Sequence, residues 1–146
     1  MNDKYIIYFI SRTKGHMVKF IENRLKANKL EGLIPTHGNI LTALYESNEK
    51  MTMKEISKKI GKDKSTVTSL VKKLESLGYV KRETSTSDKR NTYILLTEKA
   101  RDVEPTFNSI SLEVKETAYS NFTDDEKAEF LRLLRKLSTN FKKANE

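Results

Sequence analysis

The stretch that decides the fold reads TMKEISKKIGKDKSTVTSLVKKLESLGYVKRETSTSDKRNTYILLT and covers residues 52–97. It opens with Thr52 and Glu55 at the spacing of a capping box, which predicts the start of a short helix. Gly61 stands where the end of that helix favours a left-handed residue. Asp63 follows as the N-cap of a second, amphipathic helix. Two helices separated by so tight a break predict a helix-turn-helix.

The segment after these two helices has the pattern of a β-hairpin. Gly78 ends the second helix, which covers 64–77. A short strand-like run over 79–83, a polar tip over 85–90 and the apolar run 93–96 then follow. We call this predicted hairpin the wing. A helix-turn-helix followed directly by such a hairpin is a winged helix-turn-helix.

The rest of the chain is predicted to be helical. A long first helix covers 5–30, and Thr36 is the expected N-cap of a short helix after it. The helix that begins at Thr97 contains Pro105, which should kink or break it. Residues 123–126 form a second capping box that opens the last helix. The predicted fold is therefore mainly α with a small β-hairpin wing, in the order α-α-α-α-β-β-α-α.

We expect one domain over 1–146, in which the winged helix-turn-helix lobe covers 32–97 and helices flank it over 1–31 and 98–146. The flanking helices carry apolar stripes with too little partner surface in one chain. The stripe residues are Ile10, Met17, Ile21, Phe130, Leu134, Leu137 and Phe141. A second copy of the chain would bury them in a two-fold dimer, so we predict a dimerisation region there. The alternative is that they pack on their own domain as an extended bundle.

The positive charge is concentrated in the predicted lobe. The chain carries 28 Lys and Arg against 20 Asp and Glu, a net charge of +8. Between residues 54 and 90 there are eleven Lys and Arg against five acids, which accounts for +6 of that charge. A basic excess confined to one element is typical of a surface that contacts nucleic-acid phosphates. The alternative is a lysine-rich surface that is simply solvated.

The helix over 64–77 has one apolar side and one polar side. At about 100° per residue, its apolar side gathers Val67, Leu70, Val71, Leu74 and Leu77. The opposite side presents Ser65, Ser69, Lys72 and Ser76, flanked by Thr66, Thr68 and Lys73. Short hydroxyl side chains allow close approach to a major groove, and lysines reach phosphates. The alternative is an ordinary solvated helix face.

The tip of the wing combines one acid with two cations, Asp88, Lys89 and Arg90. Arg90 has the guanidinium group that a narrow, electronegative minor groove attracts. Asp88 is placed to orient it through a bidentate ion pair. The alternative is a charged turn that serves only solubility.

Other kinds of chemistry find little support in the sequence. The chain has no cysteine, and its histidines, His16 and His37, do not share a metal-ligand spacing. No phosphate loop, nucleophile elbow or catalytic carboxylate pair is visible, so we predict no enzyme, no cofactor and no metal site. The apolar run at the N-terminus is too short to span a membrane, which predicts a cytoplasmic protein. Arg12, His16 and His37 are candidates for an effector pocket; the alternative is that the histidines are surface or satisfied interfacial residues.

The residues from Met53 to Arg82, followed by Asp88-Lys-Arg90 and Leu96-Thr97, resemble the MarR family of transcriptional regulators. The specific signals are Ser65-Thr-Val-Thr68 together with the Asp88-x-Arg90-x5-Leu96-Thr97 spacing. The resemblance implies a homodimer that binds a pseudo-palindromic operator, usually as a repressor, and is often released by a small anionic or phenolic ligand. Many members carry Arg where this chain has Ser69, so guanine readout at that position is not implied.

By position in the family pattern, four hydroxyl residues would lie at the bases, Lys72 near the backbone and Arg90 in the minor groove. The full set of predicted DNA-binding residues is Lys64, Ser65, Thr66, Thr68, Ser69, Lys72, Lys73, Asp88, Lys89 and Arg90. A second class of function stays open, namely a winged helix that contacts another protein. That class predicts an apolar outer helix face, which the lysines of this chain do not supply.

Overall fold

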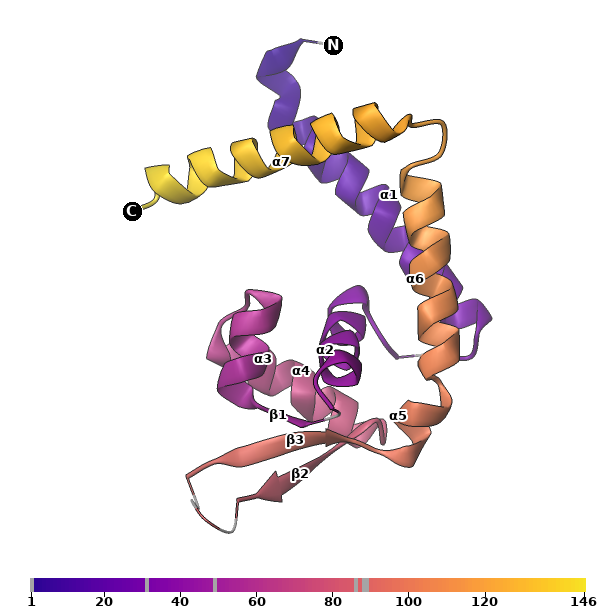
Figure 1. The fold of residues 1–146 in the computed structure, drawn as a ribbon, viewed down its shortest axis with the longest axis vertical. Helices are drawn as coiled ribbons and strands as arrows, with labels where there is room; N and C mark the ends of the chain where they lie inside the picture. The colour runs from indigo at the N-terminus through magenta and orange to yellow at the C-terminus, as the bar shows by residue number, and fades with distance from the viewer. Residues whose placement is uncertain (1, 31, 49, 86, 88–89) are drawn as a thin grey trace. The chain divides into compact units, whose positions relative to one another are not determined.

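The computed structural model describes residues 2–30, 32–48, 50–85, 87 and 90–146. Its elements confirm a mainly helical winged helix-turn-helix (Figure 1). Their bounds are η1 Asp3–Tyr5, α1 Ile6–Ala27, α2 Pro35–Glu46, β1 Lys50–Thr52, α3 Met53–Ile60, α4 Lys64–Ser76, β2 Val80–Thr84, β3 Thr92–Leu96, α5 Glu98–Asp102, α6 Glu104–Ala118 and α7 Asp124–Ala144.

The turn between α3 and α4 forms as its residues predict. At the start of α3, Thr52 Oγ1 accepts from the Glu55 N–H and the Glu55 carboxylate accepts from the Thr52 N–H, both at 3.2 Å. Gly61 ends α3 with φ +68°, a left-handed conformation that glycine adopts at no steric cost. Asp63 Oδ1 then accepts from the Thr66 N–H at 2.7 Å and caps α4. These local contacts hold the two helices at their turn.

The start of α2 differs from the prediction. Thr36 is not the N-cap; Ile34 is, because Pro35 occupies the first helical position, where its missing N–H costs nothing. The side chain of His37 takes over the capping role, since its Nδ1 accepts from the Ile34 N–H at 3.0 Å. A histidine three residues after the N-cap therefore does what a glutamate does in a capping box.

A strand that the sequence did not predict joins the hairpin. Within the described residues, β1 pairs antiparallel with β3, and the sheet has the order β1-β3-β2. Ile94 lies in the middle strand, opposite Met51 on one side and Arg82 on the other. β1 is three residues long and its last residue, Thr52, also caps α3, so it is too short to show a strand pattern of its own.

The core of the lobe lies where α2, α3 and α4 pack over the sheet (Figure 1). Its largest side chains are fully buried: Ile40, Leu41, Leu44, Ile56, Val67, Val71, Leu74, Ile94 and Leu96. Each of these helices contributes one apolar side, and β3 contributes alternate residues. The sheet extends beyond the helices as the wing. The exposed face of α4 thus belongs to a helix whose other face is fixed in the core.

The helix after the wing breaks as predicted. α5 ends at Asp102, Val103 separates the two helices, and α6 begins at Glu104. Pro105 therefore stands in the first turn of α6, a position where proline is tolerated because its N–H would have no intrahelical partner. The predicted interruption is confirmed.

The chain divides into two compact units, Met1–Ser111 and Leu112–Glu146. In the second unit the Thr123 capping box is confirmed, and Phe122 packs edge-on between Tyr119 and Phe130. The expected single domain and its 32–97 lobe stay predictions. Over the part of the chain that the structure describes, the search for a helix both long and apolar enough to cross a membrane found none.

Candidate nucleic-acid interface

The helix α4 has the two-sided character that its sequence predicts. Val67, Val71 and Leu74 are fully buried, whereas Leu70 and Leu77 are half-buried. The predicted outward residues Lys64, Ser65, Ser69, Lys72, Lys73 and Ser76 are exposed, and Thr66 and Thr68 are half-buried at the edges. The structure thus places eight short or cationic side chains around the free side of one rigid helix.

Some of these hydroxyls already use their proton within the chain. Ser65 Oγ donates to Asp63 Oδ1 at 3.1 Å, and Thr68 Oγ1 donates to the Lys64 carbonyl at 2.8 Å. Each hydroxyl oxygen keeps lone pairs that can accept a hydrogen bond from a base amino group. The amino groups at cytosine N4 and adenine N6 are hydrogen-bond donors of this kind. These hydroxyl oxygens are therefore suited to accept from them.

The N-terminus of α4 is occupied by its own cap. The pKa of the Asp63 carboxyl is lowered, chiefly because it accepts from the Thr66 N–H and also from the Thr66 and Ser65 hydroxyls. The carboxylate therefore stays ionised near neutral pH and neutralises the positive end of the helix dipole. The cationic groups that α4 offers to solvent are therefore Lys64, Lys72 and Lys73, rather than the helix end.

The tip of the wing is described in part. Arg90 is exposed one residue before Asn91, whose carbonyl accepts from the Ser85 N–H at 2.9 Å and closes the base of the tip. The predicted contact residues Asp88 and Lys89 lie outside the described residues, and so does the proposed ion pair between Asp88 and Arg90.

An ion pair that the sequence did not predict joins the wing to α4. Arg82 on β2 donates from Nε to Glu75 Oε2 at 3.1 Å, across a separation of seven residues. Both side chains are partly exposed, so this link between α4 and β2 contributes little to stability. Its members are ordinary surface charges in the sequence, and only the return of the chain through β2 brings them together.

The C-terminus of α4 ends at Gly78, as the sequence predicts, and is joined there by contacts from Thr97 and Lys99 that the sequence did not reveal. Gly78 has φ +83°, and the Tyr79 N–H donates to the Leu74 carbonyl at 2.9 Å, which completes a Schellman motif. Thr97, directly after β3, donates from Oγ1 to the Gly78 carbonyl at 2.6 Å. Lys99 on α5 donates from Nζ to the Leu77 carbonyl at 2.5 Å. We call Leu77, Gly78, Tyr79, Thr97 and Lys99 the α4 junction.

Comparison with known proteins identifies the family. A family model described as the MarR family matches residues 31–91. The regulator MgrA of Staphylococcus aureus is 31% identical over 107 residues, which are 73% of this chain and 71% of MgrA. The chain belongs to the MarR family. SarZ of Staphylococcus haemolyticus, strain JCSC1435, is 36% identical over 95 residues, 65% of this chain. The chain spans 63% of the length of that SarZ and about half of its counterparts in other staphylococci.

A solved structure agrees over nearly the whole chain. The crystal structure of overoxidized AbfR bound to DNA superposes with a TM-score of 0.73 at 26% identity, covering 95% of this chain and 93% of AbfR. MgrA and SarZ are named HTH-type transcriptional regulators rather than enzymes, as the sequence predicts for this chain.

The three predicted effector residues of this MarR-family chain lie on two elements. Arg12 and His16 are exposed on α1. His37 is buried at the start of α2, with only 4% of its surface exposed. Burial lowers the pKa of His37, and the positive charge of Lys73 lowers it further. The imidazole is therefore neutral near pH 7, as its accepted hydrogen bond from Ile34 requires.

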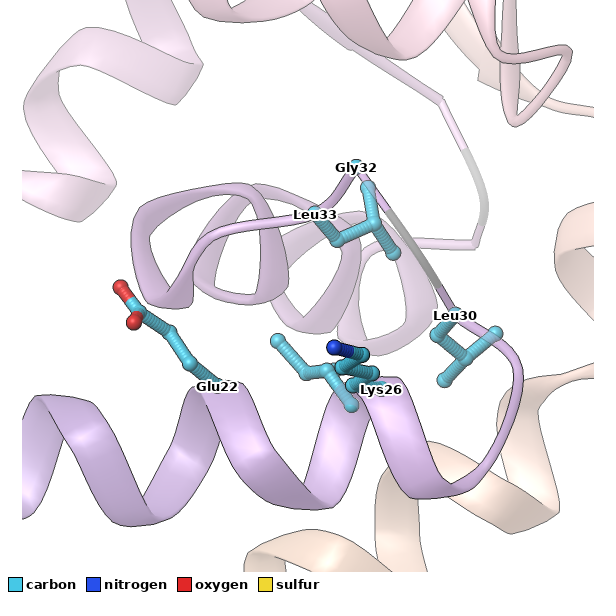
Figure 2. Close-up of a pocket in the computed structure, with 6 residues that line it drawn as sticks. Glu22, Lys26, Leu30, Gly32 and Leu33 are labelled. Carbon is cyan, nitrogen blue, oxygen red and sulfur yellow. The ribbon is translucent and has the colours of Figure 1, made fainter.

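A cavity of about 420 Å³ lies elsewhere, between the C-terminal half of α1 and the loop that leads to α2 (Figure 2). Its lining residues are Glu22, Leu25, Lys26, Leu30, Gly32 and Leu33. Glu22, Leu25 and Lys26 come from α1, and Leu30, Gly32 and Leu33 come from the loop that follows it. Gly32 also faces α4, because a Cβ on it would lie 3.5 Å from Leu77 Cδ2. Among the described residues, no three His, Cys, Asp or Glu side chains are grouped to hold a metal ion.

Proposed function

We propose that this protein is a sequence-specific regulator of transcription that binds double-stranded DNA through α4 and the wing. The observation that carries the proposal is the free face of α4, where hydroxyls and lysines surround a helix whose other face is fixed in the core. The resemblance to AbfR, which was crystallised on DNA, supports it. The net charge of +6 over residues 54–90 suits phosphate contact.

The proposed DNA contacts fall into two groups according to the length of the side chain. Ser65, Thr66, Thr68 and Ser69 are short and lie toward the base edges, while Lys72 and Lys73 extend to phosphates. Arg90 on the wing enters the neighbouring minor groove, with Lys89 and Asp88 beside it. Because hydroxyls read bases permissively, DNA shape carries much of the selectivity.

The protein acts as a homodimer on a pseudo-palindromic operator in the cytoplasm, usually as a repressor. Large apolar side chains on α1 and α7 that are 42–69% exposed support the dimer, since a soluble monomer rarely shows so many. They include Ile7, Tyr8, Phe9, Met17, Phe130, Leu133, Leu134 and Phe141. A two-fold dimer matches two half-sites about one helical turn apart.

A small anionic or phenolic ligand releases the DNA. The sequence favours a site near Arg12, His16 and His37, and Arg12, which is exposed on α1, supplies the positive charge there. The cavity beside Lys26 offers a second place, because it combines Lys26 and Glu22 with apolar residues and its Gly32 lies beside Leu77 of the α4 junction. The two candidate sites can be distinguished by measuring how aromatic carboxylates shift the melting temperature of wild type and of variants. A His16→Ala, His37→Ala double variant loses the shift in the first case, and Lys26→Met loses it in the second.

Selection of duplexes from a random pool by the purified protein tests the function itself. We expect two inverted half-sites to be enriched. Binding to the selected duplex should weaken with salt, and Lys73→Ala should lower the slope of log K against log salt by about one. Lys136→Ala removes the same charge from α7, which carries none of the proposed contact residues, and should leave the slope unchanged. A pool with no enriched sequence would refute DNA recognition and favour the protein-contact alternative.

A further inference from the structure

The C-terminal end of α4 is contacted from outside the helix-turn-helix, and one lysine makes two of the contacts there. Lys99 Nζ donates to the Leu77 carbonyl at 2.5 Å and lies 4.5 Å from the centre of the Tyr79 ring. Tyr79 is itself buried, with 4% of its surface exposed. One ammonium group thus contacts both the carbonyl of Leu77, the C-cap of the helix, and the first buried side chain after it.

We propose that Lys99 is a positioning residue for DNA recognition: it fixes the direction of α4 from α5, without touching DNA. The inference rests on the proposed DNA binding and adds a residue far from the contact face. Charge is the physical reason, because the carbonyl end of a helix is the negative end of its dipole and a cation there is stabilised. A charge-assisted hydrogen bond is also shorter and stronger than a neutral one.

The element that carries Lys99 is itself anchored to the lobe. Thr97 caps α5 and at the same time donates to the Gly78 carbonyl at 2.6 Å. The Tyr45 hydroxyl of α2 donates to the Ala100 carbonyl of α5 at 2.5 Å. Lys99 therefore extends from a helix that is fixed on both sides, so its hydrogen bond transmits the position of α5 to α4.

The Lys99 side chain lies beside the turn at Gly78. Gly78 has φ +83°, and a Cβ on it would lie 3.6 Å from Lys99 Cδ, in ordinary van der Waals contact. The aliphatic part of Lys99 thus packs along the turn while its ammonium group reaches Leu77. Loss of the charge releases the end of α4 while the packing of the stem is kept.

The end of α4 matters for selectivity more than for attraction to DNA. Base contacts from Ser65 to Ser69 require the helix axis to hold one direction, whereas phosphate contacts by long lysines adapt to a small rotation. A freer α4 should therefore lose discrimination between operator and random DNA before it loses affinity for random DNA.

The test compares wild type with Lys99→Met, which keeps the length of the side chain, Lys99→Arg, which keeps its charge, and Lys143→Met, which removes one charge at the end of α7. Each protein is titrated with the selected operator and with random duplex over a range of salt. We expect Lys99→Met to lower the ratio of operator to random affinity about tenfold, roughly the effect of one mismatched base pair. Its salt slope should stay that of wild type, because no phosphate contact is lost. Lys99→Arg should restore most of the ratio, and Lys143→Met should not change it.

Three results would overturn the proposal: an unchanged ratio in Lys99→Met, an equal loss on both duplexes as expected of partial unfolding, or the same loss in Lys143→Met. If wild type itself does not discriminate, the proposed function fails and this inference fails with it. Hydrogen exchange then still reports on the contact alone, since Lys99→Met should speed exchange at Gly78 and Tyr79 while the amides of α7 keep their wild-type rates.

Discussion

The lobe from α2 to β3 buries its apolar side chains, whereas the terminal helices α1 and α7 leave most of theirs exposed. In the lobe, Ile40, Leu41 and Leu44 of α2 are completely buried. In α7, all of whose residues are described, none is buried, and Leu25 is the buried residue of α1. Both regions are built from amphipathic helices, and α7 begins with the same kind of capping box as α3. The difference shows that a cap and an apolar stripe suffice to form a helix, whereas burial requires a partner surface, which the lobe has within its own chain.

The largest effect should come from the core of the lobe. Leu74→Ala removes a fully buried side chain from the inner face of α4, so it should lower the free energy of unfolding by about 2–5 kcal/mol. Leu133→Ala on α7, where the side chain is 48% exposed, is the matched control and should cost far less at low protein concentration. Denaturant titration of both variants decides the matter. If both variants lost the same free energy of unfolding, the proposed difference in burial between the lobe and α7 would be refuted.

The next largest effect concerns what covers the terminal helices. Sedimentation of wild type at micromolar concentration should give twice the chain mass of 16.9 kDa. Leu134→Asp should cause dissociation or unfolding, because a carboxylate would be buried without a partner in the dimer. A wild-type chain that sediments as a stable, folded monomer would contradict this and would leave the extended bundle as the explanation.

The wing should contribute a smaller effect that belongs to the lobe alone. Arg90→Ala should weaken operator binding by about 1–3 kcal/mol per lobe, most at sites with A·T-rich flanks. Arg135→Ala, which removes an exposed arginine from α7, serves as its control and should bind as wild type does. Titrations on operators with different flanks measure both. Wild-type affinity of Arg90→Ala on every flank would refute the minor-groove contact.

The smallest effect should be a pH dependence of the free energy of unfolding that arises from His37 in the lobe. Burial lowers the pKa of His37 in the folded protein, so the unfolded chain binds a proton first as pH falls. The stability from neutral His37 is therefore complete above about pH 6.5 and is lost as pH falls toward the lower folded pKa, by at most about 1.4 kcal/mol per pH unit. His37→Gln should flatten the dependence between pH 7 and 5, and His16→Ala on exposed α1 should keep it. If the stability of His37→Gln depended on pH as that of wild type does, the dependence would arise from other titratable groups.

Features of this fold that depend on neighbours in sequence were predictable. The capping box at Thr52, the left-handed Gly61, the Asp63 cap and the break before Pro105 all act over a few residues. The buried side of α4 followed from the 3.6-residue period in the same way. The exposed side of α4 then had to carry the remaining hydroxyls and lysines. The residues of the candidate interface could therefore be predicted from the same pattern as the helix itself.

Other features were decided by the tertiary structure, because they join residues whose proximity no local pattern encodes. β1 becomes a strand only when β3 returns beside it, and Arg82 meets Glu75 only after the chain turns back through β2. His37 caps α2 in a buried site because Pro35 moved the start of the helix. Lys99 reaches Leu77 across 22 residues because Thr97 fixes α5 against the end of α4. By itself, the sequence determined which helices form and which faces they present; the fold decided what holds those faces in place.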